Sequence, residues 1–249
     1  MTTVLETRNL RKQFGALTVA DGIDFRLERG ARHALIGPNG AGKTTFINLL
    51  TGGLTANSGG VFLNGLEVTR ISQRGRIQRG LGRTFQINTL FRSLTALDNV
   101  ALAVAERLGV AWHLFRRASR QGEVVRESRT LLGSLGLEAD ADVRVADLPY
   151  GKQRLVEIAI ALGMKPSVLL LDEPAAGVPS TESQRILQVL DSLPSDLAIL
   201  IIEHDMDLVF RFARRITVLS RGALLAEGTP EEISADQRVR EVYLGERHV

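Results

Sequence analysis

Gly37-Pro-Asn-Gly-Ala-Gly-Lys-Thr44 is the stretch of sequence that decides the fold of this chain. It fits the pattern G-x-x-x-x-G-K-[ST], in which glycines allow the backbone to approach phosphate groups closely. The apolar run His33–Ile36 before it is typical of a buried strand, and Thr45–Leu50 after it has the apolar spacing of one helix face. A strand, a glycine-rich turn and a helix in this order predict a phosphate-binding loop.

The predicted loop supplies several groups that attract the phosphates of a nucleotide. Its backbone N–H groups and the positive end of the following helix meet the negative charge. We expect Lys43 to reach the β- and γ-phosphates and the Thr44 hydroxyl to bind Mg²⁺. The residues expected to hold the nucleotide are Gly37, Pro38, Asn39, Gly40, Ala41, Gly42, Lys43, Thr44 and Thr45.

The composition sets wide limits on the class of protein. With 249 residues, 44% of them apolar and 24% charged, the chain can form one large domain or a core with a subdomain. The absence of cysteine excludes disulfides, thiol nucleophiles and cysteine-bound metals, and it suits a reducing cytosol. The first residues lack the pattern of a secretory signal, and no apolar run approaches the roughly 20 residues of a membrane span.

The net charge of +3 is small, but many of the arginines cluster. A basic cluster has three possible interpretations: solvated faces, a surface near anionic lipid head groups or a membrane partner, and a nucleic-acid surface. Aromatic side chains do not interleave with the basic residues as they do in single-strand binders, so we expect no nucleic-acid partner. The clustered residues are Arg70, Arg74, Arg76, Arg79, Arg83, Arg116, Arg117 and Arg120.

Strand signals lie on both sides of a helical segment. Val4–Arg8 and Ile23–Leu27 alternate apolar and polar residues, which predicts half-buried antiparallel strands. Val168–Leu171 and Ala198–Ile202 are continuous apolar runs, as in parallel strands buried on both faces. Ile71–Arg79 is expected to form a short helix with its basic side chains outward.

Strand signals stop between residues 88 and 164, where the apolar spacing is helical. Thr95 is a plausible N-cap for a helix over Ala96–Arg107. Further helices are predicted over Trp112–Ser119, Glu123–Leu135 and Lys152–Met164. The sequence therefore predicts an α/β fold with a core formed by residues 1–87 and 165–249 and a helical subdomain formed by residues 88–164.

Two adjacent carboxylates follow the first buried apolar run. An open parallel sheet binds its ligands at the carboxyl ends of its strands, so Asp172 and Glu173 should lie near the phosphates. Asp172 is expected to hold Mg²⁺ through water, and Glu173 is expected to polarise the water that attacks the γ-phosphate. His204 follows the next buried strand, where it can contact the γ-phosphate or orient Glu173.

Two further features point to nucleotide chemistry. Gln86 lies at the end of a predicted strand over Leu81–Phe85, where a neutral amide can bind Mg²⁺ or the attacking water. Leu148-Pro-Tyr-Gly-Lys-Gln-Arg154 is a loop at a helix start, and the helix dipole there favours an anion. Because Gly37–Thr45 already serves one nucleotide, this second helix start indicates contact with the ATP of another subunit.

The order of these motifs resembles the ATP-binding-cassette (ABC) ATPases over nearly the whole chain. Within that superfamily, four segments look like the ATPases of branched-chain amino-acid importers, which belong to bacterial permeases that also take up other amino acids, amides or urea. The four segments are Gly82-Arg-Thr-Phe-Gln86, Leu148–Arg154, Glu173-Pro-Ala-Ala-Gly177 and Glu241-Val-Tyr-Leu-Gly245.

The resemblance implies a RecA-like core with an antiparallel β subdomain and a helical subdomain. It also implies a head-to-tail dimer, with a second copy or a paralogue, that encloses two ATP molecules. Phe14 stands where the family places an aromatic ring that stacks on adenine. Each site would pair the phosphate loop of one subunit with residues of the other, namely Pro149, Tyr150, Gly151 and Lys152.

The same resemblance implies membrane partners. Two multi-span permease subunits would dock near Gln86 at the cytoplasmic face of the inner membrane, and a solute-binding protein would act through them. The solute is chosen by those partners and not by this chain. The alternatives are an ATPase of an export or lipid-transport system, a non-hydrolytic regulatory cassette, and a soluble cassette that acts on nucleic acid or ribosomes.

The sequence departs from the usual superfamily pattern in two places. The signature L-S-G-G-Q has Pro149 and Tyr150 in place of Ser and Gly, and Lys152 in place of Gln. The serine hydroxyl that would contact the partner's γ-phosphate is therefore absent, and Lys152 could supply charge instead. Pro179 stands where Asp or Asn is usual. Neither change removes the water-activating or metal-binding groups, so we expect ATP hydrolysis.

Overall fold

The computed structural model of the chain describes residues 2–84, 90–110 and 118–245. The chain divides into two compact units. The first, which we call the core unit, comprises Met1–Leu81, Ser167–Glu173 and Pro194–Val249. The second, which we call the helical unit, comprises Gly82–Pro166 and Pro174–Leu193.

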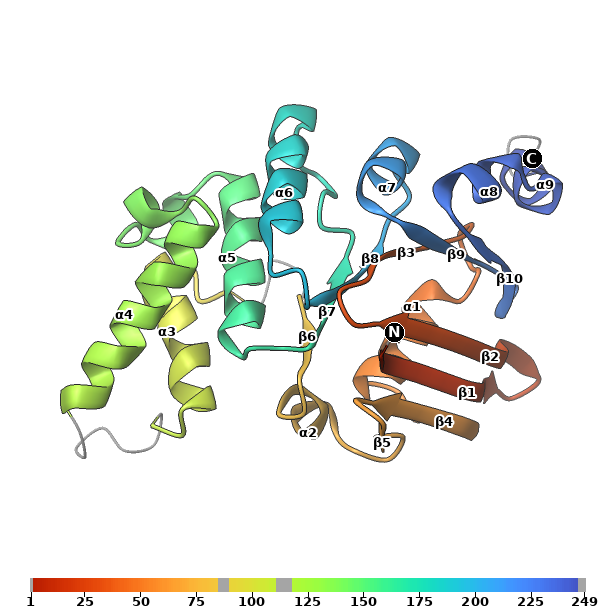
Figure 1. The fold of residues 1–249 in the computed structure, drawn as a ribbon, viewed down its shortest axis with the longest axis horizontal. Coiled ribbons are helices and arrows are strands. Elements are labelled where there is room, and N and C mark those ends of the chain that lie inside the picture. Colours follow the sequence, from red (N-terminus) through yellow and green to blue (C-terminus); the bar gives the residue numbers. More distant parts are fainter. Residues whose placement is uncertain (1, 85–89, 111–117, 246–249) are drawn as a thin grey trace. The chain divides into compact units, whose positions relative to one another are not determined.

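The larger sheet is built from the apolar runs of the sequence. Its strand order is β10-β9-β3-β8-β7-β6, and β9, β3, β8 and β7 run parallel (Figure 1). Every residue of β3 and β8 is buried, as expected for central strands covered on both faces. The mixed sheet with flanking helices confirms the predicted α/β class. The strands are β3 (Arg32–Ile36), β6 (Leu81–Arg83), β7 (Val168–Asp172), β8 (Ala198–Ile202), β9 (Arg215–Ser220) and β10 (Ala223–Gly228).

A second, antiparallel sheet has the strand order β2-β1-β4-β5. Its two long strands, β1 and β2, extend beyond the predicted strands. The predicted strands are shorter because β-bulges interrupt the apolar alternation on which the prediction depends. Asn9 has a positive φ of 44°, and the pairing shifts register between Thr7 and Leu10. The alternation of apolar and polar residues is therefore lost after the bulge, although β1 continues to Phe14. The strands are β1 (Thr3–Phe14), β2 (Leu17–Glu28), β4 (Ser58–Leu63) and β5 (Leu66–Glu67).

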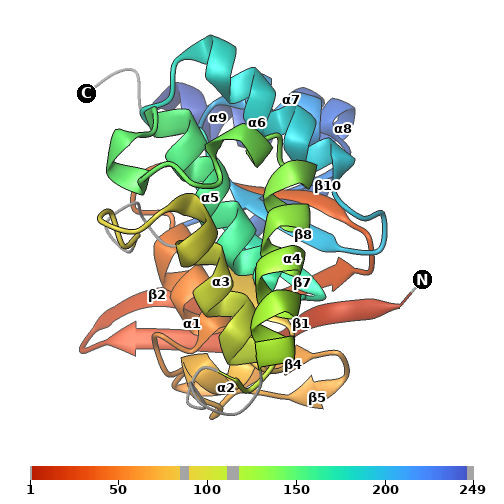
Figure 2. The ribbon, with the colours of Figure 1, turned by 90° about the vertical axis from the view of Figure 1, so that its left-hand side faces the viewer.

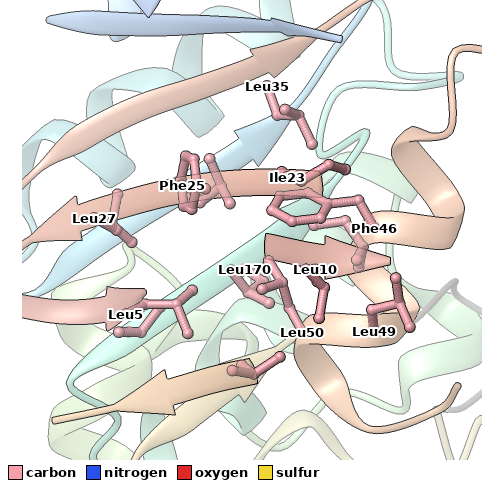
Figure 3. Packing of buried hydrophobic residues seen from close by; sticks show 14 of the residues in the cluster. Leu5, Leu10, Ile23, Phe25, Leu27, Leu35, Phe46, Leu49, Leu50 and Leu170 are labelled. Atoms are coloured by element: carbon pink, nitrogen blue, oxygen red, sulfur yellow. The ribbon is translucent and has the colours of Figure 1, made fainter. Parts of the chain in front are cut away.

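The two sheets of the core unit share one apolar core with the helix that follows the phosphate loop. Figure 3 shows side chains of this helix, α1, among those of β1, β2 and β7. Phe46 of α1 meets Phe25 of β2 edge to face, with ring centroids 5.6 Å apart. The helices of this unit are α1 (Lys43–Thr51), α2 (Gln73–Ile77), α7 (Met206–Phe212), α8 (Pro230–Ala235) and α9 (Gln237–Gly245).

The helical unit consists mainly of four helices (Figure 2). α3 packs on α4 and α5, and α5 also packs on α6. That last contact groups residues 174–193 with the helical unit, whereas the sequence analysis assigned this segment to the core. In the ranges that the structure describes, no helix is both long and apolar enough to cross a membrane. The helices are α3 (Ala96–Arg107), α4 (Ala118–Ser134), α5 (Tyr150–Gly163) and α6 (Ser180–Ser192).

One arginine of the basic cluster lies inside the core unit, so the prediction that its side chain points outward is wrong. Arg76 is 1% exposed. Its guanidinium donates to the carbonyls of Leu49 and Leu50 at 2.6 Å each, and to those of Thr69 at 2.8 Å and Ile71 at 3.0 Å. Its neighbour Arg74 is exposed as predicted. Arg76 therefore satisfies carbonyl groups at the C-terminal end of α1, where a cation is also favoured by the helix dipole.

Candidate functional site

Three adjacent parallel strands of the core unit end at the same level. Leu35 of β3 pairs with Ile202 of β8, and Ile202 pairs with Asp172 of β7. The residues that follow these strands therefore emerge along one edge of the sheet. They are the phosphate loop after β3, His204 after β8 and Glu173 after β7. The register thus brings together groups that lie far apart in the sequence.

The phosphate loop has a backbone that requires glycine at two positions. Gly37 has φ 153°, and a Cβ there would lie 2.3 Å from the carbonyl oxygen of Leu219. Gly42 has φ 101°, and a Cβ there would lie 2.7 Å from the carbonyl oxygen of Val19. The turn between β9 and β10 also holds the loop, because the Gly222 N–H donates to the Ala41 carbonyl at 2.9 Å. The loop is therefore braced by β2 and by the β9–β10 turn.

The N-terminus of α1 carries the positive end of the helix dipole and a cation at the predicted phosphate position. No side chain caps the helix at Gly42, and its first turn contains no acidic residue. The Lys43 ammonium donates to the carbonyls of Gly37 at 2.5 Å and Pro38 at 3.0 Å. It therefore lies over the loop, and the exposed Thr44 is the next residue of the same turn. These positive groups make a favourable environment for an anion.

Glu173 and His204 face each other at the same edge of the sheet. The Glu173 backbone lies in the left-handed region at φ 47°, and its N–H donates to the Ile202 carbonyl at 2.9 Å. Its Oε1 lies 3.6 Å from His204 Nδ1. About half of the Glu173 side chain, 48%, is exposed, so the carboxylate can reach a water molecule. A left-handed glutamate costs free energy, on the order of 1–3 kcal/mol, and such strain is concentrated at functional sites.

The predicted metal ligands are hard oxygen donors of the kind that Mg²⁺ binds. Asp172 is partly buried at the end of β7, and Thr44 is exposed in the first turn of α1. Both belong to the core unit and lie on elements that meet at the sheet edge described above. Gln86, the third predicted ligand, lies outside the described residues, as do Arg116 and Arg117. The donor chemistry of Asp172 and Thr44 suits Mg²⁺.

Phe14 is the last residue of β1 and is 51% exposed. The Lys12 ammonium lies 5.0 Å from the centre of its ring, within the range of a cation–π contact. The same ammonium donates to the Thr55 carbonyl at 2.9 Å, which fixes the lysine beside the ring. An exposed aromatic ring at a strand end is a surface on which a flat heterocycle can stack.

The second predicted anion site, the start of α5, belongs to the helical unit. Pro149 is the N-cap and provides no side-chain cap. The Gly151 N–H donates instead to Oε2 of Glu182 in α6, at 3.1 Å. Lys152 forms an ion pair with Asp140 at 2.7 Å, so its charge is already matched in this chain. Glu182 could not be predicted from the sequence, because a partner 31 residues away leaves no local spacing signal.

A surface pocket of about 770 Å³ borders the phosphate loop within the core unit. The tip of the loop lines one side, and the β9–β10 turn and α9 line the others. Arg238 and Glu241 of α9 contribute charged groups to this wall. The C-terminal helix is therefore a neighbour of the loop, which its position in the sequence did not predict.

Two protein-family models match this chain. The family described as "ABC transporter" matches residues 20–176, which contain the phosphate loop, the start of α5 and the Asp172-Glu173 pair. The family described as "Branched-chain amino acid ATP-binding cassette transporter" matches residues 223–249, which begin at β10 and include α9.

Several characterised relatives are similar over nearly their whole length. The high-affinity branched-chain amino acid transport ATP-binding protein BraF of Pseudomonas aeruginosa is 36% identical, with 98% of each chain covered. The corresponding protein LivG of Escherichia coli is also 36% identical, again with 98% of each chain covered. A crystal structure of the ADP conformation of an ATP-binding cassette of an ABC transporter is 30% identical, with a TM-score of 0.86, 98% of this chain and 100% of that one.

Proposed function

Because this chain belongs to the ABC transporter family, we propose that it is the ATP-hydrolysing subunit of an importer for branched-chain or other amino acids, or for amide- or urea-like solutes. The common level of β3, β8 and β7 is the observation that carries this proposal. It lines up the phosphate loop, His204 and Glu173 at one sheet edge. The relatives whose names mention branched-chain amino acid transport support the choice of solute class.

In the proposed reaction, the protein positions the phosphates and stabilises developing charge. Lys43 and the loop N–H groups would bind the β- and γ-phosphates, and Phe14 would stack on adenine. Glu173 would accept a proton from the attacking water, with His204 orienting its carboxylate. Thr44 and Asp172 would hold Mg²⁺, which neutralises phosphate charge when bound.

The proposed site is completed by a second ATPase subunit, either a copy of this chain or a paralogue. The start of α5 in that subunit, from Pro149 to Lys152, would close over the nucleotide. Two multi-span permease subunits would bind the pair at the cytoplasmic face of the membrane. Closure of the pair on ATP would then change the state of the permease, and hydrolysis would reset it.

The decisive test is the Glu173→Gln variant. We expect ATP binding, measured by titration calorimetry, to be retained, and phosphate release to fall by at least about 100-fold because the water loses its base. Glu67→Gln, at an exposed position of β5, is the matched control and should hydrolyse ATP normally. Normal hydrolysis by Glu173→Gln would show that the assigned role is wrong.

Lys43→Ala separates binding from chemistry. Removal of the ammonium should abolish measurable ATP affinity, because the loop loses the cation expected to reach the β- and γ-phosphates. An unchanged affinity would refute the phosphate-loop assignment.

The transport role has its own test. Purification of the tagged protein from detergent-solubilised membranes should recover multi-span permease subunits. Recovery of ribosomes or DNA in their place would favour a soluble cassette.

A further inference from the structure

The Glu182 carboxylate accepts a hydrogen bond from the Gly151 N–H. In the proposed function, the same N–H would bind a phosphate of the partner's ATP. Gly151 is buried, and its N–H donates to Oε2 of Glu182 at 3.1 Å. The fit is close, because a Cβ on Gly151 would lie 2.2 Å from that same oxygen. Both residues belong to the helical unit, so this contact exists within one subunit.

The chemistry of the contact explains why an anion lies there. α5 begins without a side-chain cap from Pro149 and without an acidic residue in its first turn. Its first N–H groups therefore lack acceptors from their own helix, and the positive end of the helix dipole favours a negative charge. Glu182 provides both the acceptor and the charge from the first turn of α6.

We propose that Glu182 competes with the γ-phosphate of the partner's ATP for the Gly151 N–H. The glutamate accepts from this N–H until ATP brings a second copy of this chain into place. The proposal rests on the composite site described above. One N–H group cannot donate well to both anions, and a glutamate left beside the γ-phosphate would repel it. Glu182 must therefore leave Gly151 when the dimer closes, and its departure raises the ATP concentration that closure requires.

A structural cap and a competitor predict opposite results for dimerisation. If Glu182 only stabilises the fold, its removal weakens both the monomer and the dimer. If it competes, its removal lowers the melting temperature of the monomer but makes ATP-driven dimerisation easier. The sign of the second effect distinguishes the two roles.

The experiment uses Glu173→Gln as the background, so that ATP is bound but not hydrolysed. Dimer formation is followed by light scattering during an ATP titration with Mg²⁺. Adding Glu182→Ala should lower the ATP concentration at half-maximal dimerisation by about tenfold, the factor that corresponds to about 1.4 kcal/mol. Glu182→Gln, which keeps an acceptor but loses the charge, should give a smaller shift in the same direction.

The control is Asp191→Asn, which removes one charge from the exposed last turn of the same helix. It should leave the ATP requirement unchanged. An ATP requirement that stays the same or rises in both Glu182 variants would overturn the competitor role alone. If Glu173→Gln itself stays monomeric at saturating ATP, the composite site between two copies is wrong, and the competitor role fails with it.

Discussion

At the residue scale, the buried side chain of Arg76 holds several backbone segments together through hydrogen bonds. Its guanidinium serves four backbone carbonyls at 2.6–3.0 Å, two of which belong to the last turn of α1. Burial lowers its pKa to about 10, which still leaves it charged at neutral pH. The residue is therefore a cationic cap at the opposite end of the helix from the phosphate loop.

We predict that Arg76→Met lowers the free energy of unfolding by about 3 kcal/mol, because it leaves buried carbonyl groups without donors. Urea denaturation followed by circular dichroism measures this loss. Arg74→Met, on the same short helix but exposed, should change stability by no more than about 0.5 kcal/mol. Equal effects of the two substitutions would contradict the capping role.

Some residue positions could be predicted from the sequence and others could not, and the difference has one physical reason. The positions of Gly37–Thr44 between a strand and a helix and of Asp172 and Glu173 at a strand end were predictable, because each signal lies within a few neighbouring residues. Arg76 looked like its exposed neighbour Arg74, since a short helix gave no sign of which arginine faces inward. Glu182 was missed for the same reason: its acceptor role depends on how α6 packs on α5.

At the scale of elements, α3 begins and ends as its sequence predicts. Thr95 and Asp98 form a complete capping box: the Asp98 N–H donates to Thr95 Oγ1 at 3.0 Å, and the Thr95 N–H donates to Asp98 Oδ2 at 3.2 Å. Local signals of this kind can be recognised in the sequence, because the capping residues lie only three positions apart. The long strands β1 and β2 show the opposite case, since their bulges depend on cross-strand pairing.

We predict that Thr95→Ala costs about 1 kcal/mol of stability through loss of the cap. The measurement is the shift in the urea midpoint at a constant slope. Thr130→Ala makes the same chemical change at an exposed position within α4, where the hydroxyl donates to the Arg126 carbonyl at 3.0 Å. It should have little effect or stabilise slightly, and a loss as large as that of Thr95→Ala would argue against the capping role.

At the scale of the whole molecule, a buried histidine links stability to pH. His33 of β3 is 1% exposed, and burial lowers its pKa to about 4 from 6.5, partly opposed by the charge of Glu227. Its Nε2 lies 2.8 Å from Thr217 Oγ1, which donates to Glu227 at 2.9 Å. The ring is therefore held neutral, with Nε2–H donating to the threonine.

The sign of the pH effect follows from the lowered pKa. Below pH 6.5, His33 binds a proton in the unfolded chain but stays neutral in the folded chain. The contribution of His33 to the free energy of unfolding is therefore complete above pH 6.5 and is lost as the pH falls toward 4. We predict a loss on the order of 3 kcal/mol across that window. His33→Gln, which keeps a donor but does not titrate, should remove this part of the slope. Parallel curves for both proteins from pH 6.5 to 4 would refute the prediction.

The order of motifs along the whole chain indicated the family to which the protein belongs. Sequence motifs in their order indicated an ABC ATPase of the branched-chain amino-acid type, and the family and relatives confirm that resemblance. The assignment of Gln86 to the metal and the contact of Pro149–Lys152 with a partner's ATP stay predictions. The grouping of α6 with the helical unit could not be predicted, because it follows from packing between distant segments.

The brace behind the phosphate loop has a consequence for the order in which the protein matures. Translation makes the loop at Gly37–Gly42 before it makes Leu219 and Gly222, whose carbonyl and N–H groups support the loop. A nascent chain therefore carries the phosphate loop without this support until Leu219 and Gly222 have been made. A fragment that ends before the β9–β10 hairpin has the phosphate-loop motif without the backbone groups that support it.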